Sequence, residues 1–324
     1  MQIVRSLFVV LLLLPGVLVA QDSPFAAKRV PFEAGFRVYY IVDMEGMGSA
    51  VNIREVIAGN EGERYKDRSS TDYWNFYRGL LTDEVNASIA GARSAGARSF
   101  VVNEGHGGNL FANVLPWQLD PDAILIRGYP KPLVMSTAID STFGGIIFTG
   151  AHANAGSPGV MAHTYAFDRF AVNGRVLNEP GINALIAGEL GVPLIMVAGD
   201  DVVVEESKQI LGQDLVGVVV KTAVGPSAAI TYSPKRVQQM LRDSTSVAVK
   251  RAIEKRYKPF TLARPYQVEF AVRRTFPVEF IAGIDSLMTR YRFEKTGDRT
   301  YKYSSSSARD IGYLLDAIER VVLR

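Results

Sequence analysis

Hydrophobic and polar positions along the chain follow two different periods. Short runs that are apolar at almost every position predict strands buried on both faces. They cover residues 36–43, 99–103, 123–127, 145–149, 193–199 and 215–221. Longer segments with apolar residues three or four positions apart predict helices from 70–72 to 96, over 181–190 and over 233–258. Because strands and helices alternate, the pattern indicates an α/β fold with a mostly parallel sheet covered by helices on both faces.

The last part of the chain has a different pattern. A strand at 266–272 and a helix at 276–287 are followed by two short strands, 290–294 and 299–303, and by a closing amphipathic helix at 308–324. This order predicts a small α+β module over 259–324, placed after an α/β domain over 36–258. The pattern is equally compatible with a segment that merely extends the sheet of the first domain.

The first twenty residues form a separate segment. A short positively charged start precedes an apolar run over 6–19, and Ala20 provides a small residue for cleavage. The run is too short and too broken for a comfortable membrane span. We therefore predict a signal peptide over 1–20, a periplasmic or secreted mature protein, and no stable membrane anchor.

Composition narrows the chemistry of any functional site. The 324 residues include no cysteine, which excludes disulfides, thiolate zinc sites and iron–sulfur clusters. Any metal must therefore be held by nitrogen and oxygen. A formal net charge of +3 is too small to make nucleic acid an expected partner.

Histidines follow two of the predicted strands. His106 comes shortly after the strand at 99–103, and His152 comes shortly after the strand at 145–149. In open α/β sheets, ligands bind at the carboxyl ends of the strands. One such histidine is more often a hydrogen-bonded structural residue, but two at equivalent strand ends, both among small residues, favour a binding site.

Three carboxylates add to this set. Asp43 and Glu45 lie at the end of the first strand, and Glu179 precedes the helix at 181–190. Taken singly, each is explained by a solvated turn or by a favourable helix start. Taken with the histidines, they form the nitrogen and oxygen donor set of a site for two metal ions. The sequence lacks the H-E-x-x-H motif of the zincins.

Six ordered motifs make this chemistry more specific. They are Val42-Asp43-Met44-Glu45-Gly46, Val102-Asn103-x-x-His106, Gly150-x-His152-Ala153, Ser157-Pro158-Gly159-Val160-Met161-x-His163, Glu179-x-Gly181-x-Asn183-Ala184 and Met196-Val197-Ala198-Gly199-Asp200-Asp201. In this order, the series resembles the zinc-dependent D-aminopeptidase family, self-compartmentalising peptidases once described as dipeptide transport proteins. The resemblance runs from about residue 36 to about residue 260, and more loosely to the C-terminus.

The resemblance implies a mechanism and a set of functional residues. The implied metal ligands are Asp43, Glu45, His106, His152 and Glu179, and the implied catalytic residue is His163. It implies two divalent ions per subunit, zinc, which activate a water for hydrolysis. The implied activity is that of an aminopeptidase that removes N-terminal D-amino acids, such as D-Ala, from short peptides or amides, and the predicted signal peptide makes this an exported enzyme. It also implies a homo-oligomeric ring.

Two alternatives remain open at this point. One is a non-enzymatic exported peptide-binding protein that feeds a transporter, and the other is a metallo-amidase with a different substrate range. The sequence departs from the family in its export signal, in a longer polar loop over 50–70, and in Glu104-Gly105 where Asp-Ser is expected. None of these departures removes an implied ligand.

Overall fold

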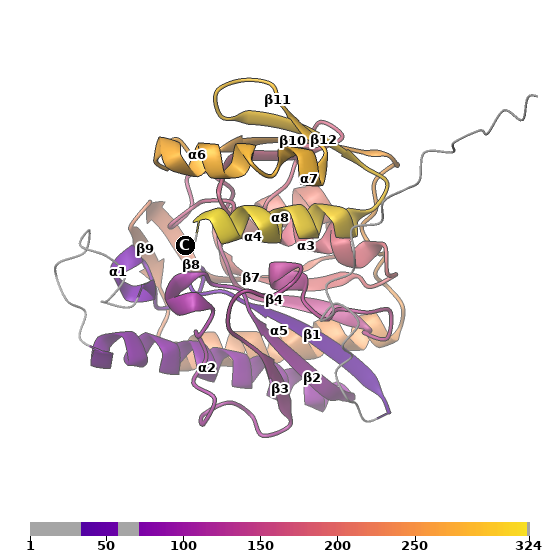
Figure 1. Cartoon of the computed structure of the whole chain (residues 1–324). Coiled ribbons are helices and arrows are strands. Elements are labelled where there is room, and N and C mark those ends of the chain that lie inside the picture. The colour runs from indigo at the N-terminus through magenta and orange to yellow at the C-terminus, as the bar shows by residue number, and fades with distance from the viewer. Residues whose placement is uncertain (1–33, 58–70, 323–324) are drawn as a thin grey trace, which may run out of the picture.

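A seven-stranded sheet forms the centre of the molecule (Figure 1). The computed structural model describes residues 34–57 and 71–322, so the predicted signal peptide lies outside the described residues. In sheet order, the strands are β3 (Ala123–Ile126), β2 (Ala97–Glu104), β1 (Phe36–Val42), β4 (Gly145–Ala151), β7 (Leu194–Asp200), β8 (Val216–Gly225) and β9 (Ala228–Thr231). All neighbours pair in parallel except β8 and β9. The predicted mostly parallel α/β fold is confirmed.

Helices cover both faces of this sheet. On one face α2 (Thr71–Ser94) packs against α5 (Pro234–Ile253), and on the other lie α3 (Glu179–Gly188), α4 (Asp201–Leu211) and α8 (Ala308–Val322) (Figure 1). Alternate residues of β1 serve the two resulting cores. Tyr39 and Ile41 pack into one core and Val38, Tyr40 and Val42 into the other, as expected for a strand buried on both faces.

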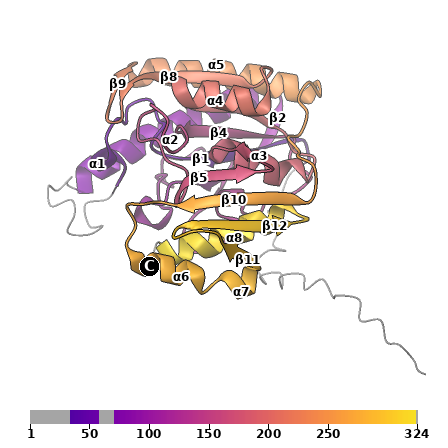
Figure 2. The same cartoon turned by 90° about the horizontal axis from the view of Figure 1, so that it is seen from above.

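A second, smaller sheet is antiparallel and carries two more helices (Figure 2). Its strands, in order, are β11 (Phe293–Lys295), β12 (Thr300–Ser305), β10 (Tyr266–Val272), β5 (Phe167–Val172) and β6 (Arg175–Val176). The helices are α6 (Val278–Asp285) and α7 (Met288–Tyr291). Because β5 and β6 precede residue 259, this sheet crosses the predicted domain boundary, which stays a prediction.

Several elements were not predicted. They are α4, β5, β6, β9 and the short helix α1 (Ile53–Val56), which lies in the segment expected to be a loop. The helix α7 was also not predicted, and it replaces the start of the strand expected over 290–294, since β11 begins only at Phe293. The rest of that loop, residues 58–70, lies outside the described residues. Within 34–57 and 71–322, we find no helix that is both long and apolar enough to span a bilayer.

The strand order creates a crevice at the centre of the large sheet. From β1 the chain moves outward through β2 to β3, and it then returns to the other side of β1 with β4 and moves outward through β7 to β8. The carboxyl ends of β1 and β4 therefore flank a topological switch point. Open α/β sheets bind their ligands at such points.

Candidate metal centre

Three adjacent strand ends position most of the predicted ligands. In the register of the sheet, Val42 of β1 lies opposite Glu104 of β2 and Thr149 of β4. Asp43 follows Val42 directly, His106 comes two residues after β2, and His152 follows the last residue of β4. The parallel register therefore brings these three side chains to one edge of the sheet.

Two glycines allow the segment after β1 to approach the end of β4 closely. A Cβ atom on Gly46 would lie 1.8 Å from the carbonyl oxygen of Ala151, and one on Gly150 would lie 1.9 Å from that of Asp43. Gly150 also has a φ of +71°, which a side chain would disfavour. The Gly46 N–H donates to the Gly150 carbonyl at 2.8 Å, so a hydrogen bond also joins the two segments where these glycines meet.

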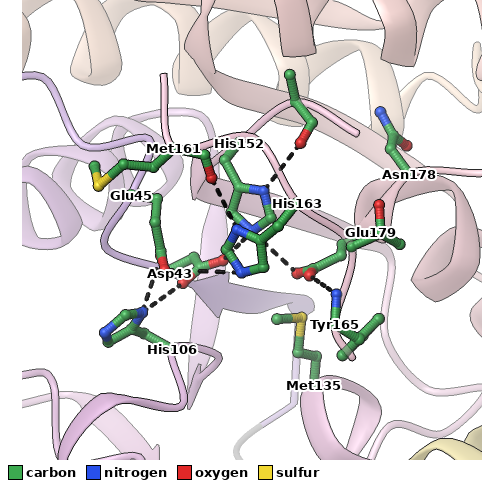
Figure 3. A network of polar contacts seen from close by, with 12 residues as sticks. Asp43, Glu45, His106, Met135, His152, Met161, His163, Tyr165, Asn178 and Glu179 are labelled. Atoms are coloured by element: carbon green, nitrogen blue, oxygen red, sulfur yellow. Dashed lines mark hydrogen bonds and ion pairs between the residues drawn. The ribbon is translucent and has the colours of Figure 1, made fainter. Parts of the chain in front are cut away.

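The Asp43 carboxylate lies between two groups of side chains (Figure 3). Its Oδ1 is 3.5 Å from Nδ1 of His106, and its Oδ2 is 3.4 Å from Nε2 of His152. On the first side, Glu45 Oε2 is 2.9 Å from His106 Nδ1. On the second side, Glu179 Oε2 is 3.5 Å from His152 Nε2. All five predicted ligands are buried and come together around Asp43.

Backbone carbonyls fix the positions of a ring proton on the two predicted ligand histidines. Nε2 of His106 lies 2.6 Å from the carbonyl oxygen of Val56, and Nδ1 of His152 lies 3.2 Å from that of Ala153. A carbonyl only accepts, so each of these nitrogens donates a proton. The other nitrogen of each ring faces carboxylates and would be the one to bind a metal ion, as in a metal-binding histidine whose second nitrogen is held by a hydrogen bond.

This donor set fits metal ions. Lone pairs and carboxylates that face one another repel unless a proton or a cation lies between them. Glu179 illustrates the need, since its Oε1 accepts from the N–H of Tyr165 at 2.7 Å, whereas its buried Oε2 accepts no hydrogen bond from the described residues. The donor atoms form two candidate groups, Asp43 with Glu45 and His106, and His152 with His163 and Glu179. Nitrogen and oxygen donors in this mixture suit zinc.

His163 belongs to the same cluster but lies in a different environment. Its ring stacks on that of His152 with centroids 3.9 Å apart, and its Nε2 is 3.9 Å from Oε1 of Glu45. Its Nδ1 donates to the carbonyl of Met161 at 2.8 Å. The side chain is 21% exposed, against 6% for His106 and 1% for His152. His163 is therefore the histidine most open to a substrate, and its distinct role stays a prediction.

Electrostatics separate the histidines further. Burial opposes protonation of His106, but Glu45 and Asp43 outweigh burial and raise its pKa to about 10. Burial and the adjacent His152 ring lower the pKa of His163 to about 3. Burial raises the pKa of Glu179, an effect that the charge of His152 opposes. Without a cation, the cluster therefore holds protons on the histidines that face carboxylates.

A cavity of about 510 Å³ opens onto this cluster. Asp43, Glu45, His106, His163 and Glu179 contribute to its wall. The rest of the lining is mainly apolar, and it includes Phe111, Val134, Met135, Phe276 and Val322. A volume in the range of small-molecule sites, with a few polar groups on one side, suits a short and compact ligand.

Sequence reasoning missed two buried lysines that support this site. Lys221 lies within β8, opposite the last residue of β7, Asp200. It is fully buried and donates to the backbone carbonyls of Glu45, Met47 and Ala50. Lys131 donates to the side chain of Asn103 and to the backbone of Glu104, just before His106. The sequence offered one signal for Lys221, since this charged residue ends the apolar run over 215–221. No local signal marks Lys131.

Comparisons with known proteins find a matching family, a similar sequence and a similar structure. A family model described as D-aminopeptidase matches residues 36–316. A D-aminopeptidase from Bacillus subtilis (strain 168) is 34% identical over 241 residues, which cover 72% of this chain and 81% of that protein. A solved structure, the Zn-dependent D-aminopeptidase DppA from Bacillus subtilis, a self-compartmentalizing protease, superposes with a TM-score of 0.76 at 27% identity. The match covers 89% of this chain and 98% of that one.

Proposed function

The chain belongs to the D-aminopeptidase family and is a metal-dependent peptidase, and from this premise we propose that it is an exported enzyme that removes N-terminal D-amino acids, such as D-Ala, from short peptides or amides. We further propose two zinc ions per subunit. The family assignment removes the alternative of a non-enzymatic peptide-binding protein. A metallo-amidase with a different substrate range stays as an outcome of the test below.

The position of Asp43 carries the proposal of two ions. Its two oxygens point toward different histidines, His106 and His152, and each histidine has a further carboxylate beside it, Glu45 and Glu179 respectively (Figure 3). A carboxylate shared in this way would contribute a ligand to each of two ion sites. Asp43, Glu45 and His106 would hold one ion, and Asp43, His152 and Glu179 the other.

The metal ions and the side chains around them would have different roles in the reaction. When bound, the ions supply Lewis acidity and lower the pKa of water near the scissile carbonyl. His163 is held by its Nδ1–H on Met161 with Nε2 turned toward Glu45. Nε2 is therefore placed to take a proton from the attacking water and return it to the leaving amine. Apolar residues form much of the remaining cavity wall, and less polar surroundings strengthen these interactions.

Export and assembly are also part of the proposal. The first twenty residues support a cleaved signal peptide with its site near Ala20, and thus a periplasmic or secreted enzyme. The related DppA is a self-compartmentalizing protease, and the similarity of this chain to it supports a homo-oligomer. Mass spectrometry of the mature terminus and light scattering test these two points separately.

Metal analysis combined with a substrate panel tests the activity. We expect two zinc ions per purified subunit, and hydrolysis of D-Ala-D-Ala and D-alaninamide in preference to their L-isomers. Glu179→Gln should lose metal and activity together, whereas Glu205→Gln, which changes an exposed carboxylate on α4, should keep both. Loss of neither in Glu179→Gln would contradict the ligand set. Turnover of amides without turnover of dipeptides would favour the metallo-amidase.

The histidine variants test the division of roles. His106→Ala and His152→Ala should each lower the zinc content. His163→Ala should keep zinc and the fold but lose roughly 10²–10⁴-fold in kcat, the usual contribution of general acid–base catalysis. If His163→Ala loses zinc as the other two do, His163 is a metal ligand and its assigned role is wrong.

A further inference from the structure

Arg273 is a charged residue of the cavity wall that the mechanism above does not use. Among the described residues that line the cavity, it is the one lysine or arginine, and the other ionisable side chains are carboxylates, histidines and Tyr165. It comes directly after β10, in the C-terminal part of the chain, whereas the candidate ligands lie between Asp43 and Glu179. The fold thus brings a cation from a distant segment to an otherwise acidic cavity.

The main chain that carries Arg273 is held from two sides. Its N–H donates to the carbonyl of Ala166 at 2.9 Å. Its own carbonyl accepts from Nη1 of Arg299 at 2.9 Å, and the same Nη1 donates to the carbonyl of Phe276 at 3.0 Å. The Phe276 ring lies 5.8 Å from the guanidinium carbon of Arg273. The side chain therefore projects from a fixed point, as a residue that recognises a ligand should.

The guanidinium itself keeps its donors available. Arg273 is half-buried, yet its side chain has no carboxylate within ion-pair distance and donates no hydrogen bond among the described residues. By contrast, Arg264 pairs with Glu189 at 2.6 Å. Glu319 shares the cavity wall with Arg273 and is buried, and its Oε1 has no hydrogen-bond partner in the described part of the chain. Arginine presents a planar fork that matches a carboxylate.

We propose that Arg273 binds the C-terminal carboxylate of the substrate and thereby selects short peptides with a free C-terminus. The inference rests on the proposed aminopeptidase function, because that function places the amine end of the substrate at the metal cluster. The far end of a dipeptide then carries the one negative charge of the ligand. Within the described cavity wall, Arg273 is the side chain whose charge complements it.

A binding experiment tests this assignment without depending on turnover. The probes are two analogues of D-Ala-D-Ala whose scissile amide is reduced to an amine, one ending in a carboxylate and one in a carboxamide. Their dissociation constants are measured by calorimetry on the zinc-loaded wild type, on Arg273→Gln, and on Arg274→Gln. Arg274 is the matched control, because it is the exposed neighbour and does not line the cavity.

We expect the wild type and Arg274→Gln to prefer the carboxylate analogue by about 10- to 100-fold, the range for a hydrogen bond to a charged group. Arg273→Gln should lose this preference while it binds the carboxamide as the wild type does. Equal weakening of both analogues by Arg273→Gln, or a wild type that binds both equally or neither, would overturn the proposal. Turnover of D-Ala-D-Ala by the wild type is scored separately, so failure of the proposed function is recognised as such.

Discussion

Replacing Lys221 by methionine tests whether a buried ammonium holds the loop that carries Glu45. Lys221 donates to three backbone carbonyls in residues 45–50. Methionine fills a similar volume but donates nothing, so three buried acceptors lose their partner. Each such loss costs about 1–3 kcal/mol, or about 6 kcal/mol in total at the middle of that range.

A compensating gain offsets part of this loss. Burial lowers the pKa of Lys221 from 10.5 to about 8. At neutral pH the side chain is still charged, so its buried charge destabilises the folded state. At about 1.4 kcal/mol for each pH unit, removal of the buried charge returns about 3 kcal/mol. We therefore expect Lys221→Met to lower the free energy of unfolding by about 3 kcal/mol at pH 7.

Urea denaturation of the metal-free proteins measures this difference, with Lys235→Met on the exposed surface of α5 as the control. Between pH 8 and 10.5, the unfolded wild type binds more protons at Lys221 than the folded protein does, so wild-type stability should rise with pH. The deficit of Lys221→Met should widen over this window. A variant as stable as the wild type, with no such widening, would refute the assigned role.

Three further predictions follow from buried groups and close contacts. Burial raises the pKa of Glu84 from 4.5 to about 7, so the stability of the wild type should fall as the pH rises from 4.5 to 7. Glu84→Gln should abolish this fall, and in urea denaturation at pH 7.5 it should be up to about 3 kcal/mol more stable than the wild type. A gain in stability that is already present at pH 4 would point to another cause. Gly46→Ala should lower the free energy of unfolding by about 1–3 kcal/mol and lower the zinc content, because its Cβ would collide with the Ala151 carbonyl. Gly225→Ala is the control, since its Cβ would meet nothing within 4 Å, and it should change neither quantity in parallel melting and metal assays. Removal of zinc by a chelator should lower the melting temperature, with recovery on adding zinc back, because the ligands converge only in the folded chain; an unchanged melting temperature would argue against a bound ion.

Local periodicity was enough to predict most of the fold. The apolar face of α2, with Trp74, Leu81 and Ile89, is buried as its spacing predicts, and β1 is buried on both faces. The strand β5 was missed because it pairs with β10, far away in the sequence, and β6 was missed because it is only two residues long and pairs with β5. Such pairing leaves only a weak local pattern.

Some residues of the candidate site were predictable from the sequence and others were not. Asp43 and His106 were predictable because strand ends on a parallel sheet share one edge. Glu179 was a candidate because it precedes a helix, and the motif order added the role of His163. Arg273 and Lys221 were not identified, since their significance depends on burial and on partners that only the folded chain brings together. The spacing of residues along the chain does not show whether a charged side chain will find an ion-pair or hydrogen-bond partner in the folded protein.

The spread of the candidate ligands along the chain has a consequence for how the ions are acquired. The ligands begin at Asp43 and end at Glu179, and they meet only after β1, β2 and β4 have paired across the centre of the sheet. A nascent or unfolded chain therefore offers no more than isolated pairs of donors, which bind weakly. The metal sites that we propose can consequently fill only after the chain has folded, so folding comes first and metal loading second.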